Sequence, residues 1–147
     1  YDDPFRNVAS IMINLMLQNR QPIIYGDGEQ KRSFSDVDDC IYCIDKLATD
    51  PNIKSQLVNI GPEDNFISVN ELFKILSNKL KFNQEPVFYK DRPNEVKLAN
   101  CSAEKAKNIL SYKKTISLEK SLDNMIDYIK KLGPKKFQYN YDLEIIN

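Results

Sequence analysis

The sequence contains no histidine and only three cysteines among its 147 residues. The absence of histidine excludes imidazole-based acid–base chemistry in this chain, together with most zinc and iron sites, which rely on that ligand. An odd number of cysteines argues against a disulfide framework and fits a reducing compartment better. We therefore expect a cytoplasmic protein.

The chain also lacks an excess of charge and any long apolar run. Its 21 lysines and arginines balance 21 acidic residues, so it has no basic field of the kind that a general nucleic-acid or acidic-membrane binder needs. No apolar run approaches the ~20 residues of a membrane-spanning helix. Hydrophobic residues make up 41% of the chain, enough for the core of about one globular domain. We expect neither nucleic acid nor membrane as a partner.

Apolar periodicity and capping residues predict five helices and several short strands. Ser68-x-x-Glu71 is a capping box, and Gly133-Pro134 is a stop signal. The helices are predicted at about 8–16, 36–48, 68–80, 102–110 and 117–132, the strands at 22–25, 30–34, 57–61 and 86–89, and a β-prone tail at 134–147. The predicted inner face of the second helix comprises Val37, Cys40, Ile41, Ile44 and Leu47.

The segment Tyr25–Asp39 is the most informative part of the sequence. Asp27-Gly28 supplies a tight turn after the first strand, because glycine adopts positive φ without steric cost. The run at 30–34 is predicted as the return strand of a hairpin. Ser35-Asp36 then offers capping oxygens for a helix that begins at Val37.

This segment resembles the extended short-chain dehydrogenase/reductase family, the NAD-dependent epimerases and dehydratases of nucleotide sugars. The resemblance is carried by Tyr25-Gly26-Asp27-Gly28, Gln30, Arg32, Phe34, Val37 and Asp39. The family usually has Asp where this chain has Ser33. The resemblance implies an α/β fold, the C-terminal part of a Rossmann-type enzyme, with small mixed sheets, about five helices and most of the Rossmann sheet absent. A chain that opens on Tyr1 fits such a fragment.

A second segment, Arg92-Pro93-Asn94-Glu95-Val96, is similar to the family's Arg-Pro-Gly-Asp-Val. Asn94 stands where the family has Gly, and asparagine is the residue that best tolerates positive φ after glycine. Glu95 stands where the family has an Asp thought to meet the ribose, and its longer side chain changes the reach of that carboxylate. Read without the family, the segment is an exposed polar turn.

Two other patterns are interpreted as structural. Cys40-x-x-Cys43 cannot complete a four-ligand zinc site in a chain with three cysteines and no histidine, so we interpret both residues as core or near-core. Tyr42-x-x-x-Lys46 matches the family's catalytic pair, but that pair lies N-terminal to the region that this chain resembles. We assign it to an ordinary helix surface and expect no catalytic residue in the chain.

The resemblance implies a substrate site built from two distant arginines. Arg32 and Arg92 would converge on the diphosphate of a UDP-, dTDP-, GDP- or CDP-sugar, because a planar guanidinium binds phosphate oxygens bidentately. Ile23 and Tyr25 would flank the base. Val8 and Glu95, the remaining contacts, would meet the nucleotide and the ribose. The alternatives are a non-catalytic nucleotide-sugar-binding module and an interaction domain whose arginines are solvated surface charges.

The same resemblance assigns residues 1–147 to the substrate-binding portion, with about 36–61 at the edge of the absent Rossmann domain. NAD would be bound by the N-terminal half and not by this chain alone. A parallel strand at 57–61 needs partners on both sides, so the isolated chain is expected to form homo-oligomers, swap elements or fold poorly.

Overall fold

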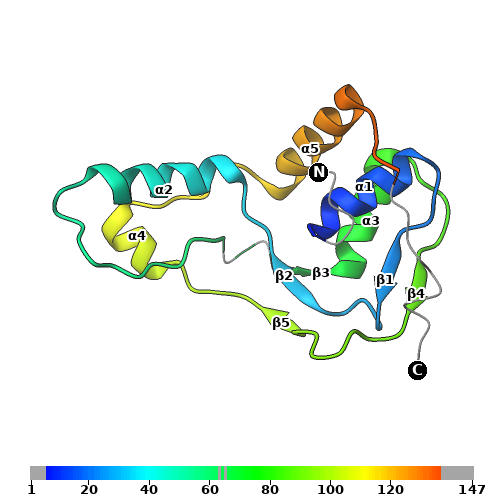
Figure 1. Ribbon diagram of the computed structural model, residues 1–147, viewed down its shortest axis with the longest axis horizontal. Helices are drawn as coiled ribbons and strands as arrows, with labels where there is room; N and C mark the ends of the chain where they lie inside the picture. The colour runs from blue at the N-terminus through cyan, green and yellow to red at the C-terminus, as the bar shows by residue number, and fades with distance from the viewer. Residues whose placement is uncertain (1–5, 63, 65, 137–147) are drawn as a thin grey trace. The chain divides into compact units, whose positions relative to one another are not determined.

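The computed structural model describes residues 6–62, 64 and 66–136, which form two compact units (Figure 1). Among the described residues, the first unit comprises 6–30, 68–97 and 122–136, and the second comprises 31–62, 64, 66–67 and 98–121. The described residues contain five helices and five short strands. Of the predicted tail, residues 137–147 lie outside the described residues.

The first unit packs helices beside a pair of parallel strands. Helix α1 (Val8–Leu17) lies against α3 (Val69–Leu80), and strand β1 (Ile23–Tyr25) pairs in parallel with β4 (Val87–Tyr89). Most of α5 (Leu118–Leu132) belongs to this unit as well. The core of the unit is formed by fully buried side chains from these elements, among them Met12, Ile13, Leu15, Ile24, Leu72, Leu76 and Ile129.

Local capping signals set the ends of these helices as predicted. Ser68 Oγ accepts a hydrogen bond from the Glu71 amide at 3.1 Å, and the Glu71 carboxylate accepts one from the Ser68 amide at 2.7 Å, which completes the capping box. Ser117 Oγ accepts from the Lys120 amide at the start of α5. Gly133 follows α5 with a φ of 86°, the left-handed conformation of a C′ glycine.

The predicted hairpin between the first two strands is wrong. β1 pairs with β4, whereas β2 (Lys31–Ser33) pairs with β3 (Phe66–Ser68) and β5 (Leu98–Ala99), so the two strands belong to different sheets. The backbone carbonyls that follow the turn accept hydrogen bonds from the start of α3: Asn70 N donates to Gly28 O, and Val69 N donates to Gln30 O. The turn therefore directs the chain toward a helix terminus instead of back along β1.

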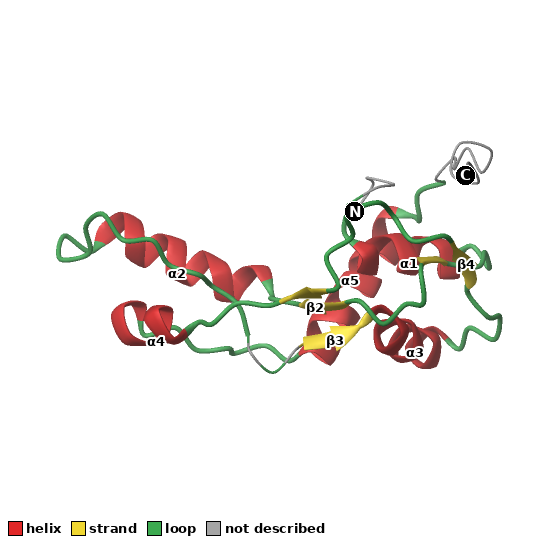
Figure 2. Ribbon diagram, turned by 90° about the horizontal axis from the view of Figure 1, so that it is seen from below, coloured by secondary structure: helices red, strands yellow, loops and turns green. Residues whose placement is uncertain are grey.

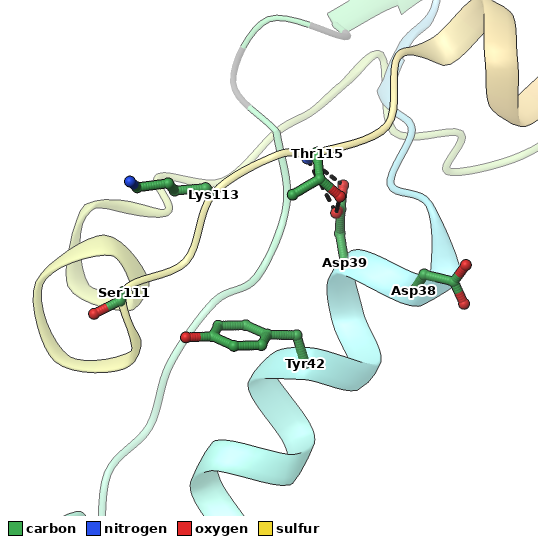
Figure 3. A pocket seen from close by; sticks show the side chains of 6 residues that line it. All are labelled: Asp38, Asp39, Tyr42, Ser111, Lys113 and Thr115. Carbon is green, nitrogen blue, oxygen red and sulfur yellow. Dashed lines mark hydrogen bonds between the residues drawn. The ribbon is translucent and has the colours of Figure 1, made fainter.

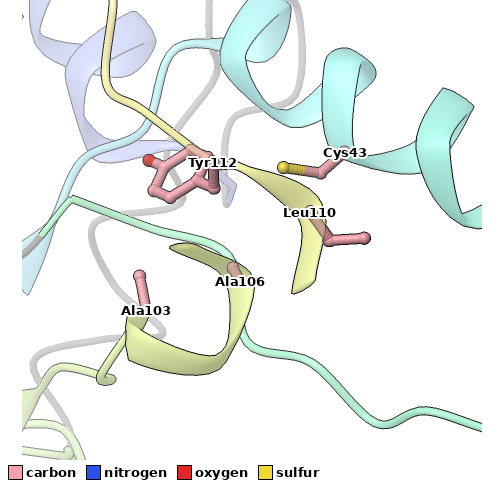
Figure 4. Close-up of a cluster of buried hydrophobic side chains, with 5 residues drawn as sticks. All are labelled: Cys43, Ala103, Ala106, Leu110 and Tyr112. Atoms are coloured by element: carbon pink, nitrogen blue, oxygen red, sulfur yellow. The ribbon is translucent and has the colours of Figure 1, made fainter. Parts of the chain in front are cut away.

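The second unit contains the three-stranded sheet and two helices. Figure 2 shows β2 beside β3. Helix α2 (Val37–Thr49) is capped by Asp36, whose carboxylate accepts from the Asp38 amide, and it packs against α4 (Glu104–Leu110). Between the helices lies a buried cluster of Cys43, Ala103, Ala106, Leu110 and Tyr112 (Figure 4).

The predicted buried face of α2 is largely exposed. Val37, Ile41 and Ile44 are 67%, 54% and 59% exposed, whereas the fully buried positions of the helix are Asp39 and Cys43. The face of α2 that packs on α4 is the one that carries Asp39 and Cys43. Asp39 accepts hydrogen bonds from Thr115 in the loop after α4, and Cys43 packs with the apolar side chains of the cluster.

Two smaller predictions in this unit are also corrected. Residues 57–61 form no strand, and Leu57 is 87% exposed; a parallel strand requires neighbours, and no described strand pairs with this segment. Helix α4 begins one residue later than predicted, with Ala103 at the N-cap, although Ser102 Oγ still accepts a hydrogen bond from the Glu104 amide at 3.2 Å.

We predict that Gly28→Ala destabilises the first unit more than Gly133→Ala does. Both glycines have positive φ, 75° and 86°, so an alanine at either position costs about 1–2 kcal/mol. A Cβ at Gly28 would also lie 2.2 Å from Asn70 Oδ1, whereas nothing lies within 4 Å at Gly133. Moving the Asn70 side chain breaks its hydrogen bonds to Asp27 O and Glu29 Oε1, so urea midpoints should separate the two variants; equal midpoints would contradict the close contact.

We predict that Tyr112→Phe stabilises the second unit and reduces its loss of stability at alkaline pH. Within the described residues the buried Tyr112 hydroxyl has no hydrogen-bond partner, and an unpaired buried hydroxyl costs about 1–3 kcal/mol. Burial, and then the nearby charge of Asp39, raises the pKa of Tyr112 from 10.0 to about 12. As the pH rises from 10 to 12 the unfolded chain loses this proton first, so the free energy of unfolding falls.

In Tyr112→Phe that fall should be smaller, as measured by urea unfolding at pH 9, 10 and 11. Tyr128→Phe is the matched control because Tyr128 is 54% exposed. An identical pH dependence in Tyr112→Phe and the wild-type chain would show that the Tyr112 hydroxyl ionises as freely in the folded as in the unfolded state.

Candidate functional site

The carboxyl ends of β1 and β4 lie side by side in the first unit. The strands are parallel and in register, with Ile23 opposite Val87 and Tyr25 opposite Tyr89. The Tyr25 and Tyr89 rings meet edge to face, with centroids 6.1 Å apart and planes at 80°. In open α/β sheets, ligands bind at the carboxyl ends of parallel strands, so this edge is the candidate site.

Arg92 reaches this edge from the loop after β4. Its Cζ lies 3.8 Å from the centroid of the Tyr25 ring, which is the geometry of a guanidinium stacked on an aromatic face. Such a stack leaves the N–H edges of the guanidinium directed away from the ring. The turn that carries Arg92 is closed by a hydrogen bond from Glu95 N to Arg92 O, and Asn94 within it has a φ of 59°.

The loop after β4 packs tightly against the glycine that follows β1. Gly26 N donates to Tyr89 O at 2.9 Å, and a Cβ on Gly26 would lie 2.0 Å from Asp91 Oδ1. Asp91 in turn accepts from Lys97 Nζ at 2.9 Å, a hydrogen bond that raises the pKa of Lys97. The sequence predicted the strand that contains Tyr89 but not the role of Tyr89, Asp91 or Lys97 at this edge, because these contacts depend on the pairing of β4 with β1.

A pocket of about 370 Å³ lies at the amino ends of the same two strands. It is lined by Asn19, Arg20, Gln21, Ile23, Gln84 and Val87. Ile24 is buried while Ile23 and Tyr25 are half-buried, so the predicted alternation along β1 is confirmed. Ile23 and Tyr25 thus share one strand face, with a pocket at one end and the Arg92 stack at the other.

The remaining predicted residues are more widely distributed. Val8 is the half-buried first residue of α1, in the first unit. Arg32 is half-buried on β2, in the second unit, and its Nη1 donates to Lys31 O at 2.9 Å. The structure therefore brings Tyr25 and Arg92 into contact, with Ile23 and Glu95 on the same strand and loop. The convergence of Arg32 with Arg92 stays a prediction.

The cysteines and the Tyr42–Lys46 pair have structural surroundings. Cys43 is fully buried, and burial is the main cause that raises the pKa of both the Cys40 and the Cys43 thiols, which disfavours a reactive thiolate. Lys46 Nζ lies 5.9 Å from the Tyr42 ring centroid. Among the described residues, no group of three or more Cys, Asp or Glu is arranged to hold a metal ion, and no helix is long and apolar enough to cross a bilayer.

Comparison with known proteins finds a family and relatives that are named for reactions of nucleotide sugars. Residues 2–125 match the family model described as GDP-mannose 4,6 dehydratase. A protein of Methanocaldococcus jannaschii provisionally named UDP-glucose 4-epimerase is 37% identical over 84% of this chain and 39% of its own length. The UDP-glucuronate 4-epimerase of Thermodesulfobacterium geofontis is 27% identical over 78% of this chain and 35% of its own length.

Solved structures show the same fold. UDP-glucose 4-epimerase of Thermotoga maritima, solved with UDP-glucose, superposes with a TM-score of 0.81 at 31% identity, covering 89% of this chain and 42% of that one. UDP-glucuronic acid 4-epimerase of Bacillus cereus, solved with UDP-glucuronic acid and NAD, gives a TM-score of 0.79 at 32% identity, covering 88% and 41%.

The chain thus spans about two-fifths of the length of these relatives and matches their C-terminal portion. The predicted α/β class with five helices and small sheets is confirmed by that match. The chain belongs to the extended short-chain dehydrogenase/reductase family, among its nucleotide-sugar epimerases and dehydratases.

Proposed function

We propose that this chain holds the nucleotide part of a nucleotide-sugar substrate in an NAD-dependent epimerase or dehydratase and contributes no catalytic residue. The observation that carries the proposal is the Arg92 guanidinium stacked on Tyr25 where two parallel strands end. A cation fixed on a ring loses little conformational freedom on meeting an anion, so its affinity for a diphosphate is higher than that of a mobile side chain.

Each predicted contact has a role that its position supports. Ile23 and Tyr25 lie on one strand face about 6.6 Å apart along the chain, and they would flank the base. Arg92 would bind the diphosphate from the carboxyl end of the strands, with Arg32 as its second cation. Glu95, whose amide closes the turn by donating to Arg92 O, would accept hydrogen bonds from the ribose hydroxyls through its carboxylate.

The substrate class that we propose is a UDP-sugar. The relatives with solved structures are named for UDP-glucose and UDP-glucuronic acid, and dTDP-, GDP- and CDP-sugars are the alternatives to compare. Val8, at the start of α1, would contribute to the nucleotide contact. NAD, when bound by the N-terminal part of the full-length protein, would supply the transient oxidation and reduction of the sugar.

We further propose that residues 36–61 pack against that N-terminal part. Val37, Ile41 and Ile44 form an exposed apolar stripe along α2, and Leu57 is also exposed. The burial of large apolar side chains is worth about 1.5–3 kcal/mol each, which favours a covering partner over water.

The three cysteines are free, consistent with a reducing cytoplasm.

We predict that the chain binds UDP-glucose with an affinity that depends on both arginines. In calorimetric titrations, Arg92→Ala and Arg32→Ala should each weaken binding at least about tenfold, since removing one charged hydrogen-bonding group costs about 1.5–3 kcal/mol. Lys74→Ala, at an exposed position of α3, is the control for loss of one positive charge.

The double variant distinguishes a shared ligand from separate effects. If both guanidinium groups contact one diphosphate, Arg32→Ala should weaken binding less in the Arg92→Ala background than it does in the wild-type chain. Strictly additive losses would contradict convergence. No heat from any of the four nucleotide sugars with a folded chain would overturn the proposed function.

We predict that Tyr25→Phe preserves and Tyr25→Ala lowers the affinity for UDP-glucose. Phenylalanine keeps the ring face under Arg92, whereas alanine releases the guanidinium; a stack of this kind is worth about 0.5–2 kcal/mol. The Nε–H proton of Arg92 reports the stack directly, because the ring current of Tyr25 should shift its resonance in the wild-type chain and in Tyr25→Phe only. An unchanged Arg92 resonance in Tyr25→Ala would contradict the stack.

A further inference from the structure

The loop 90–97, which follows β4, contacts two consecutive residues at the end of β1. The Arg92 guanidinium lies on the Tyr25 ring, with Cζ 3.8 Å from the ring centroid. The Asp91 carboxylate occupies the space beside Gly26 where a side chain would begin, since a Cβ there would lie 2.0 Å from Asp91 Oδ1. Two contacts fix both the position and the rotation of a segment, whereas the ring contact alone leaves the loop free to rotate about it.

The contact of Arg92 with the ring is too weak to order the loop by itself. Arg92 is exposed, and holding a long side chain in one rotamer costs conformational entropy. A cation–π contact at an exposed site returns only part of that cost. Whether the guanidinium rests on Tyr25 therefore depends on where the loop places the Arg92 backbone, and the neighbouring contact of Asp91 with Gly26 sets that place.

The Asp91 carboxylate is held by Lys97, at the far end of the same loop. Lys97 Nζ donates to Asp91 Oδ1 at 2.9 Å, and it is the partner that the structure shows for this carboxylate among the described residues. The Gly26 amide cannot take its place, because it donates to Tyr89 O. The position of Asp91 over Gly26 thus depends on the Lys97 ammonium.

Carboxylates surround the Lys97 ammonium. The hydrogen bond to Asp91 is the largest cause that raises the pKa of Lys97, and the charges of Asp91, Asp27 and Glu95 add to that rise. All three carboxylates lie on the loops that leave the carboxyl ends of β1 and β4. An ammonium that is already bonded to a carboxylate is better placed to hold these loops than to bind a diphosphate.

A buried carboxylate in the second unit fixes a loop in the same way. Asp39 points from α2 to the loop after α4, where it accepts hydrogen bonds from the Thr115 amide and hydroxyl (Figure 3). Asp39 is 4% exposed. The Asp91 and Lys97 side chains are 57% and 53% exposed, so the contact that fixes the loop 90–97 can be removed without opening a core.

We propose that Lys97 is a positioning residue of the nucleotide-sugar site. By holding Asp91 against Gly26 it fixes the backbone from which Arg92 extends, so that the guanidinium lies on the Tyr25 ring with its N–H donors directed away from the ring. A loop that is ordered before binding loses less conformational entropy when the ligand arrives. The inference rests on the proposed function where it concerns UDP-glucose, whereas the effect on the stack can be measured without a ligand.

The first measurement is the Nε–H resonance of Arg92 in the ligand-free chain. Lys97→Met should move it toward its position in Tyr25→Ala, because the ring current is lost as the guanidinium leaves the ring. Lys97→Arg should preserve the wild-type shift, since it restores a charged donor to Asp91. Lys90→Met removes an exposed ammonium from the same loop and should leave the resonance unchanged. Amide resonances remote from the loop should stay in place in every variant, which separates a released loop from an unfolded chain.

Two substitutions of Asp91 separate geometry from charge. Asp91→Asn keeps an oxygen that accepts from Lys97 and should retain the stack. Asp91→Ala removes the acceptor together with the contact to Gly26, and it should release Arg92 as far as Lys97→Met does. The double variant Lys97→Met/Asp91→Ala should show no larger shift than either single variant, because both substitutions remove the same contact.

Calorimetric titration with UDP-glucose connects the stack to binding. Lys97→Met should weaken binding about two- to fivefold, as expected for the loss of one exposed ion pair, and Lys97→Arg should bind as the wild-type chain does. In the Asp91→Ala background, Lys97→Met should have little further effect. A further loss as large as in the wild-type chain would show that Lys97 contacts the diphosphate directly and would overturn the positioning role.

The failure of this proposal and the failure of the proposed function give different results. An Arg92 resonance that does not move in Lys97→Met overturns the positioning role, whether or not UDP-glucose binds. A resonance that moves while the affinity for UDP-glucose stays at the wild-type value overturns it as well. A resonance that moves in a chain that binds none of the four nucleotide sugars contradicts the proposed function and supports only the dependence of the stack on Lys97.

Discussion

The parallel, in-register pairing of β1 with β4 is the constraint on which the candidate nucleotide site depends. Because Tyr25 is opposite Tyr89, both strands end at the same level and their loops leave from one edge. Arg92 lies only three positions beyond Tyr89, so the loop must turn back at once for its guanidinium to reach the Tyr25 ring. A slip of one residue would turn Tyr25 or Tyr89 to the opposite face of the sheet and separate the stack.

The turn after β1 is held by hydrogen bonds to the start of α3 and not by a return strand. Gly26 and Gly28 both have positive φ, and the amides of Val69 and Asn70 at the start of α3 donate to the carbonyls of the turn. Gln30 Nε2 also donates back to Tyr25 O. The capped N-terminus of α3 thus fixes the loop beneath the site, so the helix cap contributes to the position of Tyr25 as well as to the stability of α3.

What the sequence predicted well was local, and what it predicted poorly was the choice of partner. The Ser68–Glu71 capping box, the C′ glycine at Gly133 and the positive φ of Asn94 each depend on a few adjacent residues. The prediction of a hairpin was wrong because β1 pairs with β4, which lies more than sixty residues away in the sequence. The predicted inner face of α2 was wrong because helical periodicity identifies an apolar stripe but not the element that covers it. In the structure Val37, Ile41 and Ile44 are exposed.

Two tyrosines beside cations illustrate that geometry, and not residue type, decides which contact can serve as a binding site. The Arg92 Cζ lies 3.8 Å from the Tyr25 ring centroid, so its flat guanidinium covers the ring and its N–H donors are directed away from the ring. Lys46 lies 5.9 Å from the Tyr42 centroid as a compact, hydrated charge that leaves the ring available. At Tyr25 the aromatic ring therefore fixes the orientation of a guanidinium at the carboxyl ends of β1 and β4, whereas Tyr42 and Lys46 make only a loose contact on the surface of α2. The same pair of residue classes thus gives an ordered cation in one place and an ordinary surface pair in the other, because only the planar guanidinium can lie flat on a ring.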